Sequence, residues 1–73
     1  MNSKTLKLIR TYLELKQNEM ARLIKVSHVT YNAIENDKIE ISDKILESIY
    51  NNIDNNLILM MKALANDEEI GRK

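Results

Sequence analysis

The chain has 73 residues, enough for one domain with a small hydrophobic core. It contains no cysteine and one histidine, which excludes disulfides, thiolate metal sites and histidine metal clusters, so we expect neither a metal nor a cofactor. The formal net charge is zero, and there is no signal peptide and no apolar run of membrane length. We therefore expect a cytoplasmic protein without a membrane partner, and no feature indicates a small-molecule ligand.

The charged residues are distributed unevenly along the chain. Residues 1–38 hold seven basic and four acidic residues, a net charge of +3, whereas residues 39–73 hold four basic and seven acidic residues, a net charge of −3. A basic first half favours an anionic partner for that half. The alternative interpretation is a chance scatter of solvated charges.

The pattern of apolar residues predicts an all-α protein. Proline is absent, glycine occurs once, and no segment alternates as a strand would. Apolar residues at helical spacing predict a compact five-helix bundle, with helices at about residues 3–13, 17–24, 28–36, 42–52 and 55–66. We expect a single domain over residues 1–66 and a charged flexible tail over residues 67–73.

The first predicted helix has a buried stripe made of Leu6, Ile9 and Leu13. The second and third helices are separated by a turn of only about three residues, 25–27. Ser27 is a suitable N-cap for the third helix, because its hydroxyl can accept a backbone N–H of the first turn. So short a turn makes the two helix axes cross sharply, as in a helix-turn-helix.

This stretch resembles the helix-turn-helix of the Cro and cI repressors, the XRE family. The resemblance covers roughly residues 4–53 and rests on Arg10, Gln17, Met20, Ala21, Ile24, Val26, Ser27, Ile34, Glu35 and Asn36. It implies a lambda repressor-like domain that binds double-stranded DNA through a recognition helix at residues 28–35. The function it implies is that of a sequence-specific transcriptional regulator, a repressor like those of phage and mobile elements.

Carried over position by position, the resemblance also implies which residues contact DNA. Bases would face the recognition helix, and phosphates would face Gln17 and the ends of the motif. The residues carried over in this way are Gln17, His28, Val29, Thr30, Asn32 and Ala33. Lys16, Asn36 and Lys38, which lie beside these helices, are further expected DNA contacts. Asn32 can bind adenine through two hydrogen bonds, and a recognition helix without arginine favours an A·T-leaning site. The alternatives are that His28 is simply an exposed helix-start residue and that Asn36 and Lys38 are solvated loop residues.

Two structural features follow from the same resemblance. Arg10 and Glu35 would form a partly buried ion pair that joins the first helix to the recognition helix and holds the fold. Glu14, Lys25 and Asp37 stand where the family often has glycine. We therefore expect a left-handed backbone at these three turns, at a steric cost that is smaller for aspartate than for glutamate or lysine.

The predicted helix caps differ in quality. Ser42 and Asp54 carry side-chain oxygens that can accept a backbone N–H at the starts of the fourth and fifth helices. Lys16 stands at the cap position of the second helix but has no acceptor atom, so it is a poor cap.

The fifth predicted helix is more apolar than a one-sided surface helix requires. Its core face can hold Leu57, Met60, Met61 and Leu64. The surplus apolar surface predicts a homodimer interface, with the residues Leu57, Ile58, Met61 and Leu64. Such a dimer would present two recognition helices to a near-palindromic operator with half-sites about 34 Å apart. A helix buried in a thin core is the alternative.

A protein-interaction module with the fifth helix as its working surface is the alternative function. The neutral net charge and the absence of arginine from residues 28–35 favour it, whereas the basic first half opposes it. No set of residues combines a nucleophile, a base and an orienting group, so we expect no catalytic residues and no enzymatic activity.

Overall fold

The computed structural model describes residues 1–66 of the chain. Within these residues there is no strand and there are five helices: α1 (Ser3–Tyr12), α2 (Gln17–Leu23), α3 (His28–Glu35), α4 (Asp43–Asn52) and α5 (Asn55–Leu64). The predicted all-α fold of five helices is confirmed. Each helix begins within one residue of its expected position and ends at most two residues earlier. The predicted flexible tail, 67–73, lies outside the described residues.

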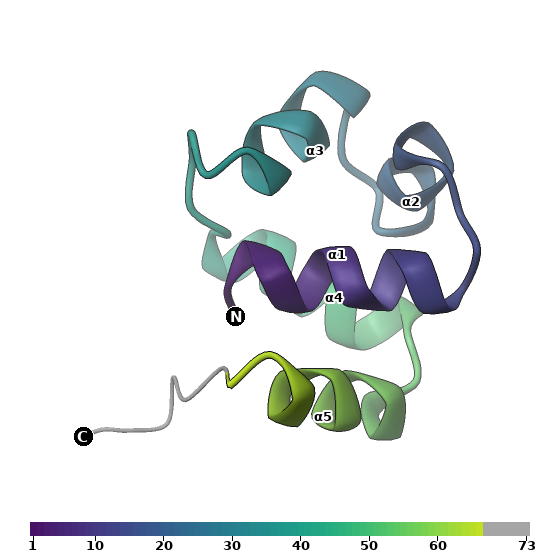
Figure 1. Cartoon of the computed structure of the whole chain (residues 1–73). Coiled ribbons are helices and arrows are strands. Elements are labelled where there is room, and N and C mark those ends of the chain that lie inside the picture. The colour runs from purple at the N-terminus through teal and green to yellow at the C-terminus, as the bar shows by residue number, and fades with distance from the viewer. Residues whose placement is uncertain (67–73) are drawn as a thin grey trace.

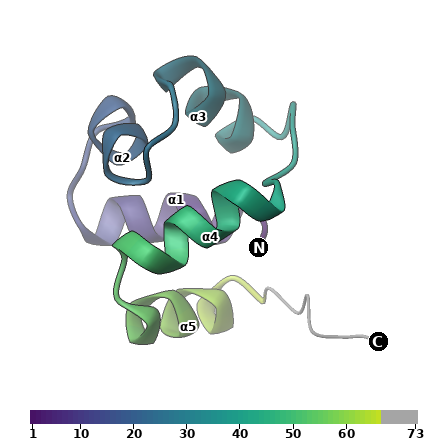
Figure 2. The ribbon, with the colours of Figure 1, turned by 180° about the vertical axis from the view of Figure 1, so that it is seen from behind.

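The helices are arranged in tiers around α1 (Figure 1). α2 and α3 lie on one side of α1 and α5 on the opposite side, while α4 lies behind α1, as the reverse view shows (Figure 2). α2 packs against α3, and α1 packs against both α5 and α3. None of the five described helices is both long and apolar enough to cross a membrane. This arrangement holds α3 at one edge of the molecule.

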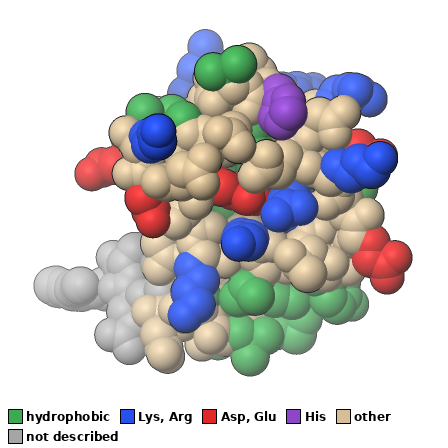
Figure 3. Space-filling model, turned by 45° about the horizontal axis from the view of Figure 1, so that its top comes forward, with side chains coloured by type: hydrophobic (Ala, Val, Ile, Leu, Met, Phe, Trp, Pro, Cys, Tyr) green, Lys and Arg blue, Asp and Glu red, His purple; other side chains and the backbone are tan. Residues whose placement is uncertain are grey.

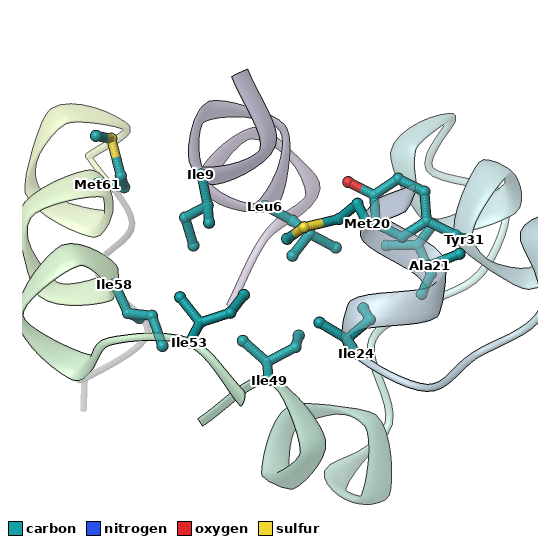
Figure 4. Close-up of a cluster of buried hydrophobic side chains, with 11 residues drawn as sticks. Leu6, Ile9, Met20, Ala21, Ile24, Tyr31, Ile49, Ile53, Ile58 and Met61 are labelled. Carbon is teal, nitrogen blue, oxygen red and sulfur yellow. The ribbon is translucent and has the colours of Figure 1, made fainter. Parts of the chain in front are cut away.

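The core draws one face from every helix. Most of its buried side chains lie three or four residues apart along the helices, and two, Ile24 and Ile53, directly follow α2 and α4. The buried residues are Leu6, Ile9, Met20, Ala21, Ile24, Tyr31, Ile34, Ile49, Ile53, Ile58 and Met61. Figure 4 shows Ile49 and Ile53 directed toward α1, between the side chains of α2 and those of α5. The helix-turn-helix therefore shares one continuous core with α4 and α5.

The predicted quality of the caps is confirmed. Ser27 Oγ accepts the backbone N–H of Thr30 at 3.0 Å, and Ser42 Oγ and Asp54 Oδ1 accept N–H groups of the first turns of α4 and α5. Lys16 provides no side-chain cap for α2. Instead, the carboxylate of Glu19 accepts the backbone N–H of Lys16 at 2.8 Å, so α2 begins with half of a capping box.

The expected left-handed turns are also confirmed. Glu14, Lys25 and Asp37 have φ angles of 58°, 63° and 60°, and each follows the end of a helix. At the second of these turns, the N–H of Val26 donates to the carbonyl of Ala21 at 2.9 Å, the bond of a Schellman motif. Each non-glycine residue in this conformation costs about 1–2 kcal/mol.

Replacing Lys25 by glycine is expected to raise the free energy of unfolding by about 0.5–1 kcal/mol. Glycine removes the steric cost of the left-handed conformation, and its greater freedom in the unfolded chain offsets part of that gain. Urea unfolding followed by circular dichroism measures the change. Lys25→Ala keeps the Cβ atom and should stay near the wild type, and a glycine variant no more stable than the alanine variant would contradict the assignment of strain to this residue.

The face of α5 that meets the core differs from the prediction. Ile58 and Met61, expected in the homodimer interface, are only 1% and 5% exposed, because they lie three residues apart on the side of α5 that joins the core. Met60 and Leu64, expected on the core side, are exposed, and so is Leu59. The predicted interface is therefore wrong for Ile58 and Met61. The sequence of an almost wholly apolar helix does not indicate which of its sides is buried. Leu57 is half-buried.

Candidate nucleic-acid interface

The two sides of α3 have different surroundings. Tyr31 and Ile34 point into the core and are buried. His28, Val29 and Asn32 lie on the outward side and are exposed, and the side chain of Val29 is 81% exposed. The hydroxyl cap at the start of the helix and the two buried side chains together hold this outward side in place.

A line of amide side chains crosses the outward surface from α2 to the end of α3. Asn32 Nδ2 donates to Gln17 Oε1 at 3.0 Å, and Asn36 Nδ2 donates to Asn32 Oδ1 at 3.1 Å. Asn32 and Asn36 are exposed and Gln17 is half-buried. The structure thus brings together three of the residues expected to contact DNA.

Three further expected residues flank this line. Lys16 immediately precedes α2, and Lys38 follows the turn after α3; both are exposed. Ala33 is half-buried on the flank of α3. These positions place two cations near opposite ends of the amide line.

Thr30 does not belong to this group. At about 100° per residue, it lies nearly opposite Asn32 around the helix. Its Oγ1 accepts a hydrogen bond from the Ser27 hydroxyl at 2.9 Å, and it lines a cleft shared with α4. Thr30 therefore does not share the surface of Asn32, and its expected contact with DNA stays a prediction.

The ion pair implied by the family resemblance is present. Arg10 Nε lies 2.7 Å from Glu35 Oε2, and Arg10 Nη2 donates to Glu35 Oε1 at 3.3 Å. The side chains are 18% and 4% exposed, so the pair is largely removed from water. Arg10 Nη1 also donates to the carbonyl of Leu15 at 3.0 Å, which ties the α1–α2 turn to the same guanidinium.

Two partners of Glu35 were missed by reasoning from the sequence. Gln17 Nε2 donates to Glu35 Oε1 at 2.9 Å, and the Tyr31 hydroxyl donates to Glu35 Oε2. The spacing of four residues between Tyr31 and Glu35 was a signal for the second bond. No local signal indicates the first, because Gln17 and Glu35 lie eighteen residues apart in different helices.

The carboxyl group of Glu35 is held in its ionised form. Burial alone would raise its pKa, but the hydrogen bonds from Arg10, Tyr31 and Gln17 outweigh burial and lower the pKa below its ordinary value of 4.5. The hydrogen bond with Glu35 raises the pKa of Arg10. Burial, and then the hydrogen bond to Glu35, raises the pKa of Tyr31, so that the phenol remains a donor.

This depressed pKa predicts how stability depends on pH. Because Glu35 binds a proton less readily in the folded chain than in the unfolded chain, its contribution is present above pH 4.5 and is lost as the pH falls through the folded-state pKa. Thermal unfolding at a series of pH values below neutral should therefore show a fall in stability that is shallower in a Glu35→Gln variant. Equal pH dependence in the two proteins would contradict this role of the carboxylate.

The surface around α3 carries basic side chains, with acidic side chains among them (Figure 3). Figure 3 shows the histidine, purple, on this face of the molecule, with lysine and arginine side chains, blue, on both sides of it. Hydrophobic side chains, green, gather at the lower edge of the same view, over α5. The outward side of α3 and the apolar part of α5 are thus separate surfaces.

Comparison with known proteins agrees with this geometry. A family model described as helix-turn-helix matches residues 6–51, more than half of the chain, and this range contains most of α1, all of α2 and α3, and most of α4. No curated protein and no solved structure matches the chain. The chain belongs to the Cro/C1-type helix-turn-helix (XRE) family of DNA-binding regulators.

Proposed function

We propose that this protein is a transcriptional repressor that binds a near-palindromic operator as a homodimer, with α3 in the major groove. The observation that carries the proposal is the amide line on the outward side of a helix-turn-helix, in which the half-buried Gln17 holds the exposed Asn32 and Asn32 is bonded to the exposed Asn36. Polar side chains that are both exposed and held in place suit contact with base edges and phosphates.

Asn32 is the main base-reading residue in this proposal. Its two hydrogen bonds within the protein use one N–H and one lone pair of the carbonyl oxygen, which leaves one donor and one acceptor free. Adenine presents the matching acceptor, N7, and donor, N6–H, in the major groove. Val29, whose side chain is exposed beside it, offers methyl groups to a thymine methyl.

The flanking residues serve affinity and position. Lys16 and Lys38 can neutralise phosphates near the two ends of the amide line, and the amide of Asn36 can donate to a phosphate oxygen. His28, exposed at the first position of α3, donates to a base edge or a phosphate. These contacts fix the register of the helix on the duplex.

The homodimer is proposed to form through the exposed apolar surface of α5. Leu59, Met60 and Leu64 are exposed on α5, and Tyr12 at the end of α1 is 60% exposed. Tyr12 and Met60 line one shallow groove together with Leu57, so the surface continues from α5 onto α1. An apolar surface formed by two helices favours contact with a second copy.

The same surface supports the second candidate function. A module that binds another protein would also use an exposed apolar face, and the neutral net charge of the chain fits such a role. The two functions differ in how binding depends on salt. Operator binding should weaken steeply as salt rises, because phosphate contacts release counterions, whereas a protein-binding module should show little affinity for DNA at any salt concentration.

Replacing Asn32 by alanine is expected to cost about 1–3 kcal/mol of binding free energy at one base pair of the operator. Fluorescence anisotropy on the best-bound duplex and on its single-base variants measures this, and the discrimination should disappear at one position only. Asn51→Ala, at an exposed asparagine of α4, is the matched control and should leave the profile unchanged. An Asn32 variant with the wild-type profile at every position would refute the assigned contact.

A further inference from the structure

We infer that Glu35 is a positioning residue for base recognition, which acts through Gln17 to fix the orientation of the Asn32 amide and thereby favours adenine over thymine. This inference rests on the proposed function, since it concerns the same DNA-facing surface. It gives Glu35 a second role, in addition to the ion pair with Arg10 that joins α1 to α3.

The series of hydrogen bonds that orients the Asn32 amide begins at Glu35, whose carboxylate can only accept hydrogen bonds. An ionised carboxylate has no donor, and Glu35 is kept ionised by its bonds with Arg10 and Tyr31. Gln17 can therefore approach Glu35 Oε1 favourably only with its NH₂ group, and this is the contact observed at 2.9 Å. The carboxylate thus determines which way the Gln17 amide is turned.

The orientation of Gln17 then determines that of Asn32. With Nε2 directed to Glu35, the oxygen Oε1 of Gln17 is the atom left to meet α3, and Asn32 Nδ2 donates to it at 3.0 Å. Turning the Asn32 amide over would bring two carbonyl oxygens together and lose that bond. The Gln17 end is the restricting one, because Asn36 is exposed and its own amide can turn to suit Asn32.

A fixed amide reads the order of donors and acceptors in the groove. Adenine presents the acceptor N7 beside the donor N6–H, and the Asn32 amide can bond both groups in only one of its two orientations. If thymine replaces this adenine, thymine O4 faces the carbonyl oxygen of Asn32, and the two acceptors repel each other. Asn32 could donate to O4 only if its amide turned over. Holding the amide in one orientation therefore raises the preference for A·T over T·A at this base pair.

The test uses two variants that change in different ways the relay, meaning the hydrogen bonds from Glu35 to Gln17 and from Gln17 to Asn32. Gln17→Met removes the relay while keeping the size of a half-buried side chain. Glu35→Gln can point its own NH₂ group at Gln17, which would turn Gln17 and then Asn32 over. Lys16→Met is the matched control, since it removes a proposed phosphate contact next to Gln17 without touching the relay.

The measured quantity is the ratio of the affinities for two duplexes that differ at one base pair, which is A·T in one and T·A in the other. This is the base pair at which the Asn32→Ala variant no longer discriminates. Gln17→Met should lower this ratio about tenfold, the value of one hydrogen bond to a fixed partner, and Glu35→Gln should lower it at least as far. Lys16→Met should weaken binding to both duplexes equally. Circular dichroism verifies folding of each variant, and Gln17→Met alone suffices if Glu35→Gln does not fold.

The inference is overturned if the wild type distinguishes A·T from T·A through Asn32 and Gln17→Met keeps the same ratio. A wild type without any sequence preference would overturn the proposed function and this inference together. The two failures are therefore distinguishable in one set of measurements.

Discussion

Replacing Glu35 by alanine is expected to lower the free energy of unfolding by about 3 kcal/mol. The change leaves the largely buried guanidinium of Arg10 without its carboxylate, and it removes the acceptor of the Tyr31 hydroxyl and of Gln17 Nε2. In a chain of this size such a loss lowers the melting temperature by about 15 °C. Urea and thermal unfolding followed by circular dichroism measure both quantities.

A double-mutant cycle of Glu35→Ala with Arg10→Met measures the interaction free energy between the two residues, apart from their other contacts. Each single variant leaves one charged group unpaired, so the double variant should lose less stability than the two single losses added together, by about 1–3 kcal/mol. Glu47→Ala, at an exposed glutamate of α4, is the matched control and should change stability by less than about 0.5 kcal/mol. A Glu35→Ala variant as stable as this control would show that the pair behaves like an exposed surface pair.

Replacing Leu64 by glutamate is expected to abolish the homodimer and to weaken operator binding by about two orders of magnitude. Leu64 is 65% exposed in the single chain, so a charge is tolerated there in the monomer, whereas in an apolar interface it would be buried without a partner. Losing the second subunit removes the gain from binding two half-sites at once. Sedimentation equilibrium and anisotropy on the full operator give the two results.

The control places the same charge on an exposed apolar residue outside α5. Ile39 is 44% exposed in the connector between α3 and α4, and the groove that it lines contains no residue of α5. Ile39→Glu should leave the oligomeric state unchanged. A Leu64→Glu protein that remains dimeric, or a wild type that binds its operator as a monomer, would contradict the proposed interface.

Local chemistry made much of the fold predictable from the sequence. The hydroxyl of Ser27 and the apolar spacing of α2 and α3 indicated both helices, because caps and helical periodicity act over a few residues. The left-handed turn at Lys25 followed from the family resemblance. Features that depend only on neighbouring residues were therefore recovered well.

The remaining features depend on how helices pack. α5 is apolar around most of its circumference, so its sequence could not tell that Ile58 faces α1 and Leu64 faces outward. Gln17 and Asn32 are fifteen positions apart and lie in different helices, so no local sequence pattern indicates their contact. Thr30 is expected to contact DNA like Asn32, yet the helical repeat sets the two side chains on nearly opposite sides of α3.

Selection of bound duplexes from a random DNA pool by the intact protein tests operator recognition most directly. A homodimeric repressor should enrich a near-palindromic sequence with half-sites about 34 Å apart. Its affinity for that sequence should fall steeply as salt rises, and the Asn32→Ala variant should no longer select one A·T pair of it. A pool that shows no enriched sequence after repeated selection would contradict the proposed function.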